Sequence, residues 1–183
     1  MVFNTTASTP AVKLNKSIQV LKIIVIGLPD TGKTTFVKTI SQSTVWDGIE
    51  SQGWLSGQLT VDENLLVYFL EPPEMKHFDF MWLRELIAET EADGFVVLMD
   101  SAQPDHFGGA VSIIQTIRAN HPGVPIVTAT TRQDDPHAWS SEDIRMGLRF
   151  PNEIPVLPCI CSKPKMVKEI VLQLLYKIFD VQQ

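Results

Sequence analysis

One short segment constrains the fold of this chain more than any other. Residues 27–34 read GLPDTGKT, which matches the pattern G-x-x-x-x-G-K-[ST] at every fixed position. A nearly continuous apolar run over 20–26 precedes the segment, and residues 34–40 follow it with apolar side chains at helical spacing. A buried strand, a glycine-rich turn and a helix in this order predict a phosphate-binding loop in an α/β protein.

Each fixed residue type of this segment has a physical reason. Gly27 and Gly32 allow the backbone to curl so that its N–H groups point inward, where the positive end of the helix also favours an anion. Lys33 is predicted to reach the β- and γ-phosphates and to serve catalysis, and the Thr34 hydroxyl is predicted to bind Mg²⁺. The remaining predicted nucleotide contacts are Asp30 and Thr31 in this segment and Thr35 directly after it.

The rest of the chain alternates strand and helix signals. We expect strands at 59–61, 65–70, 95–99, 125–129 and 154–159, with helices at 79–89, around 110–117, at 140–148 and at 167–179. Together with 20–26 this predicts a three-layer α/β fold with a mostly parallel six-stranded sheet, in which a hairpin between 58 and 71 contributes one antiparallel strand. Residues 1–17 lack periodicity and are expected to be a flexible leader before a single domain at 18–183.

Composition excludes several classes of protein. The 15 Lys and Arg against 21 Asp and Glu give a formal charge of −6, which disfavours charge-driven nucleic-acid binding. No run of apolar residues is long enough to span a bilayer, and no lipidation motif provides a membrane anchor. The two cysteines are separated by a single residue, which suits a reduced, cytoplasmic protein better than a disulfide.

A second motif follows a predicted strand much further along the chain. Residues 131–134 read TRQD, and they resemble the Asn-Lys-x-Asp guanine motif of small GTPases. In that motif the carboxylate accepts hydrogen bonds from N1 and N2 of guanine, and adenine has no such donor pair. The alternative is that Asp134 caps a polar turn with no role in binding.

Over 20–180 the chain resembles the Ras-like small GTPases, and in particular a bacterial branch that includes the gliding-motility polarity GTPases and Rab-like relatives. Four further segments carry this resemblance: 78–82, 92–101, 125–127 and 155–159. The resemblance implies a Ras-like P-loop domain that binds GTP or GDP with Mg²⁺. Ile160 and Cys161 fall where the last guanine-contacting loop usually has Ser-Ala, and Cys161 is a predicted nucleotide contact. The resemblance also implies a regulatory partner, such as a roadblock-type or GTPase-activating protein.

The guanine motif departs from the family pattern at two positions. Thr131 replaces an asparagine and so loses an amide that tethers the phosphate loop. Arg132 replaces a lysine, but its methylene stem can still cover the base. Asp134 is retained, so the expected preference for guanine rests on this residue.

The segment that resembles switch II departs further. The family pattern Asp-x-x-Gly-Gln falls on 71–75, where Glu71 is expected to hold an Mg²⁺-bound water. Glu74 replaces a glycine and places a carboxylate near the γ-phosphate, and Met75 cannot orient the attacking water as glutamine does. Pro72 and Pro73 stiffen the loop. We therefore expect slow hydrolysis of GTP, and GDP binding at least as tight as GTP binding.

Switch I is expected between 43 and 57. Thr44, Ser51 and Ser56 are possible Mg²⁺ ligands in this stretch and no motif selects one of them; Ser51 is the candidate included in the predicted metal site. Trp46 and Trp54 also lie in this stretch. On an exposed loop they would anchor a partner, and otherwise they pack on the edge of the sheet.

Three functions are consistent with these residues. The first is a GTP-binding switch that hydrolyses slowly. The second is a degenerate, non-hydrolysing scaffold of the same fold that acts through protein interactions. The third is a P-loop ATPase or small-molecule kinase, against which Asp134 argues.

Overall fold

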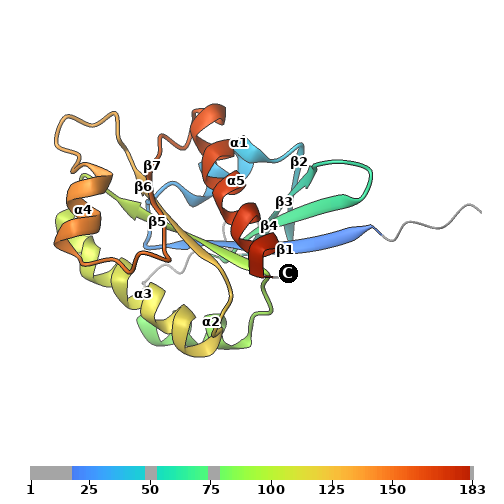
Figure 1. Cartoon of the computed structure of the whole chain (residues 1–183), viewed down its shortest axis with the longest axis horizontal. Coiled ribbons are helices and arrows are strands. Elements are labelled where there is room, and N and C mark those ends of the chain that lie inside the picture. Colours follow the sequence, from blue (N-terminus) through green and yellow to red (C-terminus); the bar gives the residue numbers. More distant parts are fainter. Residues whose placement is uncertain (1–17, 48–52, 74–78, 182–183) are drawn as a thin grey trace, which may run out of the picture.

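The structure, a computed structural model, describes residues 18–47, 53–73 and 79–181 as a three-layer α/β domain (Figure 1). Its strands are β1 (Gln19–Gly27), β2 (Ser43–Asp47), β3 (Trp54–Thr60), β4 (Leu65–Glu71), β5 (Gly94–Asp100), β6 (Ile126–Thr131) and β7 (Val156–Pro158). Its helices are α1 (Lys33–Ile40), α2 (Phe80–Glu89), the 3₁₀ turn η1 (Pro104–His106), α3 (Phe107–Asn120), α4 (Ser141–Gly147) and α5 (Pro164–Val181). The predicted leader at 1–17 lies outside the described residues.

The strands form one sheet in the order β2-β3-β4-β1-β5-β6-β7. β3 runs antiparallel to both β2 and β4, whereas β4, β1, β5, β6 and β7 pair in parallel. The predicted α/β class and the antiparallel strand are confirmed, but the predicted six strands are one too few. The missing strand is β2, which lies at the edge of the sheet and is mostly exposed. Its sequence therefore lacks the pattern of buried apolar residues by which a strand is predicted.

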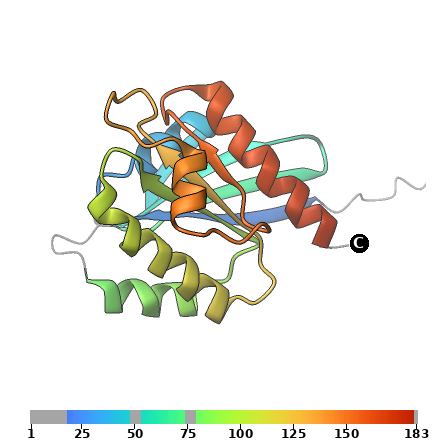
Figure 2. The same ribbon diagram turned by 60° about the vertical axis from the view of Figure 1, so that its left-hand side comes forward.

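Two apolar clusters cover the two faces of the sheet. On one face, α1 and α5 pack on the residues of β1 that alternate from Leu21 to Val25, and on the other face α2, α3 and α4 pack on Ile24 and Ile26 (Figure 2). β5 lies between β1 and β6 in the interior of the sheet, and all seven of its residues are buried. Burial on both faces is the reason that the central strands read as continuous apolar runs.

Two helix starts follow directly from the sequence. The Asp79 side chain accepts a hydrogen bond from the backbone N–H of Met81 and caps α2. The Ser140 hydroxyl accepts from the N–H of Asp143 and donates to its carboxylate, so Ser140 caps the start of α4.

Most of the expected switch I segment is strand. Residues 44–47 pair with 54–57 across β2 and β3, and residues 48–52 lie outside the described part of the chain. Trp46 packs against the cluster beneath α1 and α5, and Trp54 packs against the opposite cluster. Of the two alternatives for these tryptophans, packing on the sheet is the one that the structure supports.

Candidate functional site

The carboxyl ends of the parallel strands meet at one edge of the sheet and enclose a pocket of about 440 Å³. The loop after β1 passes to α1 on one face, while the chain after β5 passes to α3 on the other face. Ligands of open α/β sheets bind at such a reversal. The pocket is lined by Asp30, Thr31, Gly32, Lys33, Thr34, Thr35, Thr131, Arg132, Asp134, Ile160, Cys161 and Ser162.

The loop between β1 and α1, together with the start of α1, forms one wall of the pocket. We call this wall, residues 30–34, the phosphate wall. A Cβ atom on Gly27 would lie 2.6 Å from the carbonyl oxygen of Leu98 on β5, so only glycine allows β1 and β5 to pack here. Gly32 precedes α1 with a φ of 93°, which is in the left-handed region that glycine adopts without strain. The two glycines of the motif therefore have separate structural roles.

Lys33 and Thr31 close the loop on itself. The Lys33 ammonium donates to the carbonyl of Leu28 at 3.0 Å, and the Thr31 hydroxyl donates to the same carbonyl at 2.9 Å. Lys33 is buried at the start of α1, beside the positive end of the helix. A cation and a helix N-terminus that face the same space form a site for phosphate.

Thr34 and Glu71 meet across the phosphate loop. The Thr34 hydroxyl donates to a Glu71 carboxylate oxygen at 2.7 Å, although the two residues lie 37 positions apart in the sequence. Glu71 ends β4 and is 2 % exposed. A buried carboxylate next to a hydroxyl presents hard oxygen ligands beside the phosphate wall, and this donor set fits Mg²⁺.

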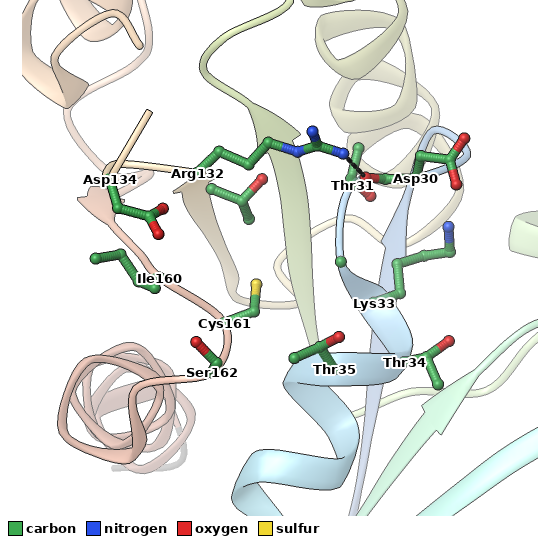
Figure 3. A pocket seen from close by; sticks show the side chains of 12 residues that line it. Asp30, Thr31, Lys33, Thr34, Thr35, Arg132, Asp134, Ile160, Cys161 and Ser162 are labelled. Carbon is green, nitrogen blue, oxygen red and sulfur yellow. Dashed lines mark hydrogen bonds between the residues drawn. The ribbon is translucent and has the colours of Figure 1, made fainter. Parts of the chain in front are cut away.

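Arg132 connects the two halves of the pocket. Its guanidinium donates to the carbonyl of Asp30 at 3.0 Å (Figure 3). It also pairs with the buried Asp100 carboxylate at 3.0 Å. Arg132 and Asp30 both have left-handed backbone conformations, with φ of 57° and 59°. Such conformations cost free energy in a non-glycine residue, so the contacts around them must hold the two loops in place.

The loop after β6 presents Asp134 to the pocket. Thr131 ends the strand in a buried position, where its hydroxyl donates to the carbonyl of Met99. The Gln133 side chain donates to Ser101 and to the carbonyl of Trp139, which fixes the turn. Asp134 is exposed and its carboxylate lies on the pocket side of the loop (Figure 3).

The loop after β7 carries two thiols, of which one reaches the pocket. Cys161 lines the pocket, whereas Cys159 is fully buried in the cluster beneath α5. The hydrogen bond from Cys159 lowers the pKa of the Cys161 thiol; burial and Asp134 oppose this, and the Cys161 backbone N–H and Arg132 add to it. The same hydrogen bond, together with burial, raises the pKa of Cys159. Cys161 is thus the thiol of the pair that ionises first.

Most residues that the sequence nominates lie together at this edge. Gly27 shapes the loop from behind the pocket, and the predicted contact residues of the two motifs line it: Asp30, Thr31, Gly32, Lys33, Thr34, Thr131, Arg132 and Asp134. Ser51, Glu74 and Met75 lie outside the described residues. The sequence did not single out Asp100, which ends the apolar run of β5; a lone carboxylate after a buried strand was the available signal.

No protein-family model matches this chain, and no curated protein matches it. Among solved structures the chain is similar to the G domain of the T. maritima FeoB iron transporter. The TM-score is 0.62 and the identity is 18%, over 90% of this chain and 100% of that chain. Within the described residues, no helix has the length and apolar character that a bilayer span requires. The similarity shows that this chain has the three-layer fold of a P-loop G domain.

Proposed function

We propose that this protein binds the guanine nucleotides GTP and GDP together with Mg²⁺ and acts as a slowly hydrolysing molecular switch. The observation that carries the proposal is the meeting of Lys33 and Asp134 in one pocket, from motifs far apart in the chain. Lys33 lies at the phosphate wall and Asp134 at the opposite end, as a nucleotide with its base toward Asp134 requires. The G-domain fold supports the same assignment.

The roles of the side chains follow from their chemistry. Lys33 neutralises phosphate charge, and the loop N–H groups of 30–34 donate to phosphate oxygens. Thr34 and Glu71 would hold Mg²⁺, Thr34 directly and Glu71 through water, and the ion would supply charge neutralisation on the phosphates. Asp134 would accept from the two guanine donors, and the backbone of Cys161 would close the base site.

The slow rate in this proposal rests on the sequence at 74–75. Glu74 and Met75 stand where hydrolysing relatives have glycine and glutamine, so neither of these positions offers a side chain that orients the attacking water. We infer that a regulatory partner, of the roadblock or GTPase-activating type, supplies the missing groups. The proposal also includes a relationship to the bacterial gliding-motility branch. It includes a cytoplasmic location as well, because such a location suits two free thiols.

Titration with GTP, GDP and ATP, each with and without Mg²⁺, tests the function directly. We expect both guanine nucleotides to bind and ATP to bind at least about a hundredfold more weakly, because adenine lacks the donors that Asp134 accepts. Single-turnover hydrolysis then separates the switch from the non-hydrolysing scaffold. Tighter binding of ATP, with turnover, would replace the guanine assignment with an ATPase or kinase.

Lys33→Ala with Lys38→Ala as a control tests the phosphate wall. Both lysines lie on α1, but Lys38 is exposed and does not line the pocket. We expect Lys33→Ala to abolish measurable binding, while circular dichroism shows a retained fold, and Lys38→Ala to bind as the wild type does. Unchanged affinity in Lys33→Ala would remove the phosphate loop from the site.

A further inference from the structure

We propose that Cys161 is a thiol modification site whose reaction with low-molecular-weight disulfides and nucleotide binding exclude each other. The Cys161 sulfur lies within the pocket, between Arg132 and the start of α1 (Figure 3). The inference rests on the proposed function only where it concerns the nucleotide. The reactivity of the thiol follows from its own surroundings.

Three features on three different elements stabilise the Cys161 thiolate. The first is the buried thiol of Cys159, two residues away in the chain, which lowers the pKa of the Cys161 thiol. The second is the N-terminus of α1, because a Cβ atom on Gly32, the residue that precedes the helix, would lie only 3.0 Å from the Cys161 sulfur. The third is the guanidinium of Arg132 across the pocket. Cysteines at helix N-termini and beside cations are the reactive ones.

The two thiols have different access to solvent. Cys159 is completely buried and packs in the core, so it is closed to reagents. Cys161 is 8 % exposed, and the exposed part faces an open pocket that is wide enough for a small reagent. Cys159 is therefore a positioning residue that holds the thiolate, and Cys161 is the residue that reacts.

The reaction is a thiol–disulfide exchange. Cys161 loses its proton to solvent, and its thiolate attacks one sulfur of a disulfide R–S–S–R. The Cys161–S–S–R bond forms as the R–S–S–R bond breaks, and the departing thiolate R–S⁻ takes up a proton. A dithiol reductant reverses the exchange, so no net oxidant is needed beyond the disulfide itself.

The adduct and a nucleotide require the same space. Gly32 lies beside the Cys161 sulfur, and Lys33 and Thr34 follow it along the phosphate wall. A group attached to the sulfur would fill the middle of the pocket between this wall and Asp134. Modification should therefore prevent nucleotide binding, and bound nucleotide should protect the thiol.

The test uses 5,5′-dithiobis(2-nitrobenzoate), whose released thiolate is coloured, on the full chain at neutral pH. We expect one fast equivalent per chain, assigned to Cys161 by mass spectrometry and absent in Cys161→Ala. Cys159→Ala should slow this phase about tenfold, and Cys159→Ser, which keeps a hydrogen-bond donor, should restore most of the rate. The modified protein should lose GDP binding at least about a hundredfold and regain it with dithiothreitol.

GDP titration of the untreated protein separates the two proposals. If GDP binds and saturating GDP slows the fast phase at least about tenfold, the exclusion is supported. If GDP binds but Cys161 reacts no faster than the unfolded chain, or reacts equally in its presence, this inference is overturned and the proposed function stands. If GDP does not bind but the fast phase persists, the nucleotide function fails and the reactive thiol stands.

Discussion

The Arg132 guanidinium donates to the backbone carbonyl of Asp30 at 3.0 Å, across 102 positions of sequence. The same guanidinium pairs with Asp100, whose carboxylate is 1 % exposed and also accepts from Ala102 and Gln103. One side chain thus ties the phosphate loop to the ends of β5 and β6. Compared with the guanine motif of small GTPases, Thr131 lacks the asparagine amide that holds the phosphate loop in place. In this chain the Arg132 guanidinium makes a contact to that loop at the same edge of the sheet.

Arg132→Ala should weaken GDP binding by about tenfold to a hundredfold. The variant loses a charge-assisted hydrogen bond to the phosphate loop and leaves Asp100 without its cation, at about 1.5–3 kcal/mol. Isothermal titration with GDP measures the loss. Arg145→Ala is the matched control, because Arg145 pairs with Glu142 on α4 at the surface. This variant should bind GDP as the wild type does. Equal affinity in the two variants would show that the tether does not support the site.

Asp134→Asn should shift selectivity from guanine toward xanthine nucleotides. The amide can donate where the carboxylate accepted, so it matches the extra carbonyl of xanthine. The ratio of GDP to XDP affinity is the measurement. Asp135→Asn is the control, because the Asp135 carboxylate accepts from the backbone N–H of His137, which lowers its pKa, and it does not line the pocket. An unchanged ratio in Asp134→Asn would remove this residue from base recognition.

Thr34→Ala should reduce the dependence of GDP affinity on Mg²⁺. The Thr34 hydroxyl, which donates to Glu71 at 2.7 Å, is the proposed direct ligand of the ion. Without this hydroxyl the site binds Mg²⁺ more weakly, so Mg²⁺ adds little to the affinity for GDP. Titrations with Mg²⁺ and with a chelator should differ at least about tenfold in the wild type and only a few-fold in the variant. Thr39→Ala, on the same helix outside the pocket, should behave as the wild type does. A wild-type GDP affinity that does not depend on Mg²⁺ would contradict the proposed metal site.

Glu74→Gly should raise GTP affinity relative to GDP affinity. Two unit charges about 5 Å apart repel by about 3 kcal/mol at an effective dielectric constant of about 20, which sets the upper size of the change. Adding Met75→Gln should also raise single-turnover hydrolysis above the wild-type rate, which we expect at or below about 10⁻⁴ s⁻¹. Both residues lie outside the described part of the chain, so this prediction rests on sequence. A wild type that prefers GTP and hydrolyses it rapidly without a partner would refute it.

Gly57→Ala should destabilise the fold by about 2 kcal/mol. A Cβ atom on Gly57 would collide with the Ser41 hydroxyl and lie 2.7 Å from Val37, so α1 would have to move away from β3. Gly108→Ala is the opposite control, since a Cβ atom there meets nothing within 4 Å and alanine favours the helix by about 0.5 kcal/mol. Urea unfolding of the two variants should therefore shift in opposite directions. A Gly57→Ala variant as stable as the wild type would contradict this account of the α1–β3 contact.

The sequence by itself determined the features that depend on local pattern. The phosphate loop, the buried strands around it, the capped starts of α2 and α4 and the long amphipathic α5 are each written in a short stretch of residues. Periodicity and fixed spacing act over a few residues, so they can be read without knowing what lies opposite. The order of strand and helix signals then indicated the α/β class.

The tertiary structure decided what depends on pairing and on distant contacts. β2 is a strand because it pairs with β3, and Trp46 and Trp54 pack on the sheet because that pairing turns them toward opposite faces. The Arg132–Asp30 tether and the contact between Cys161 and Gly32 join segments that no local pattern connects. Such contacts are set by the order of strands in the sheet, since it is the sheet that brings the ends of β1, β5, β6 and β7 to a single edge.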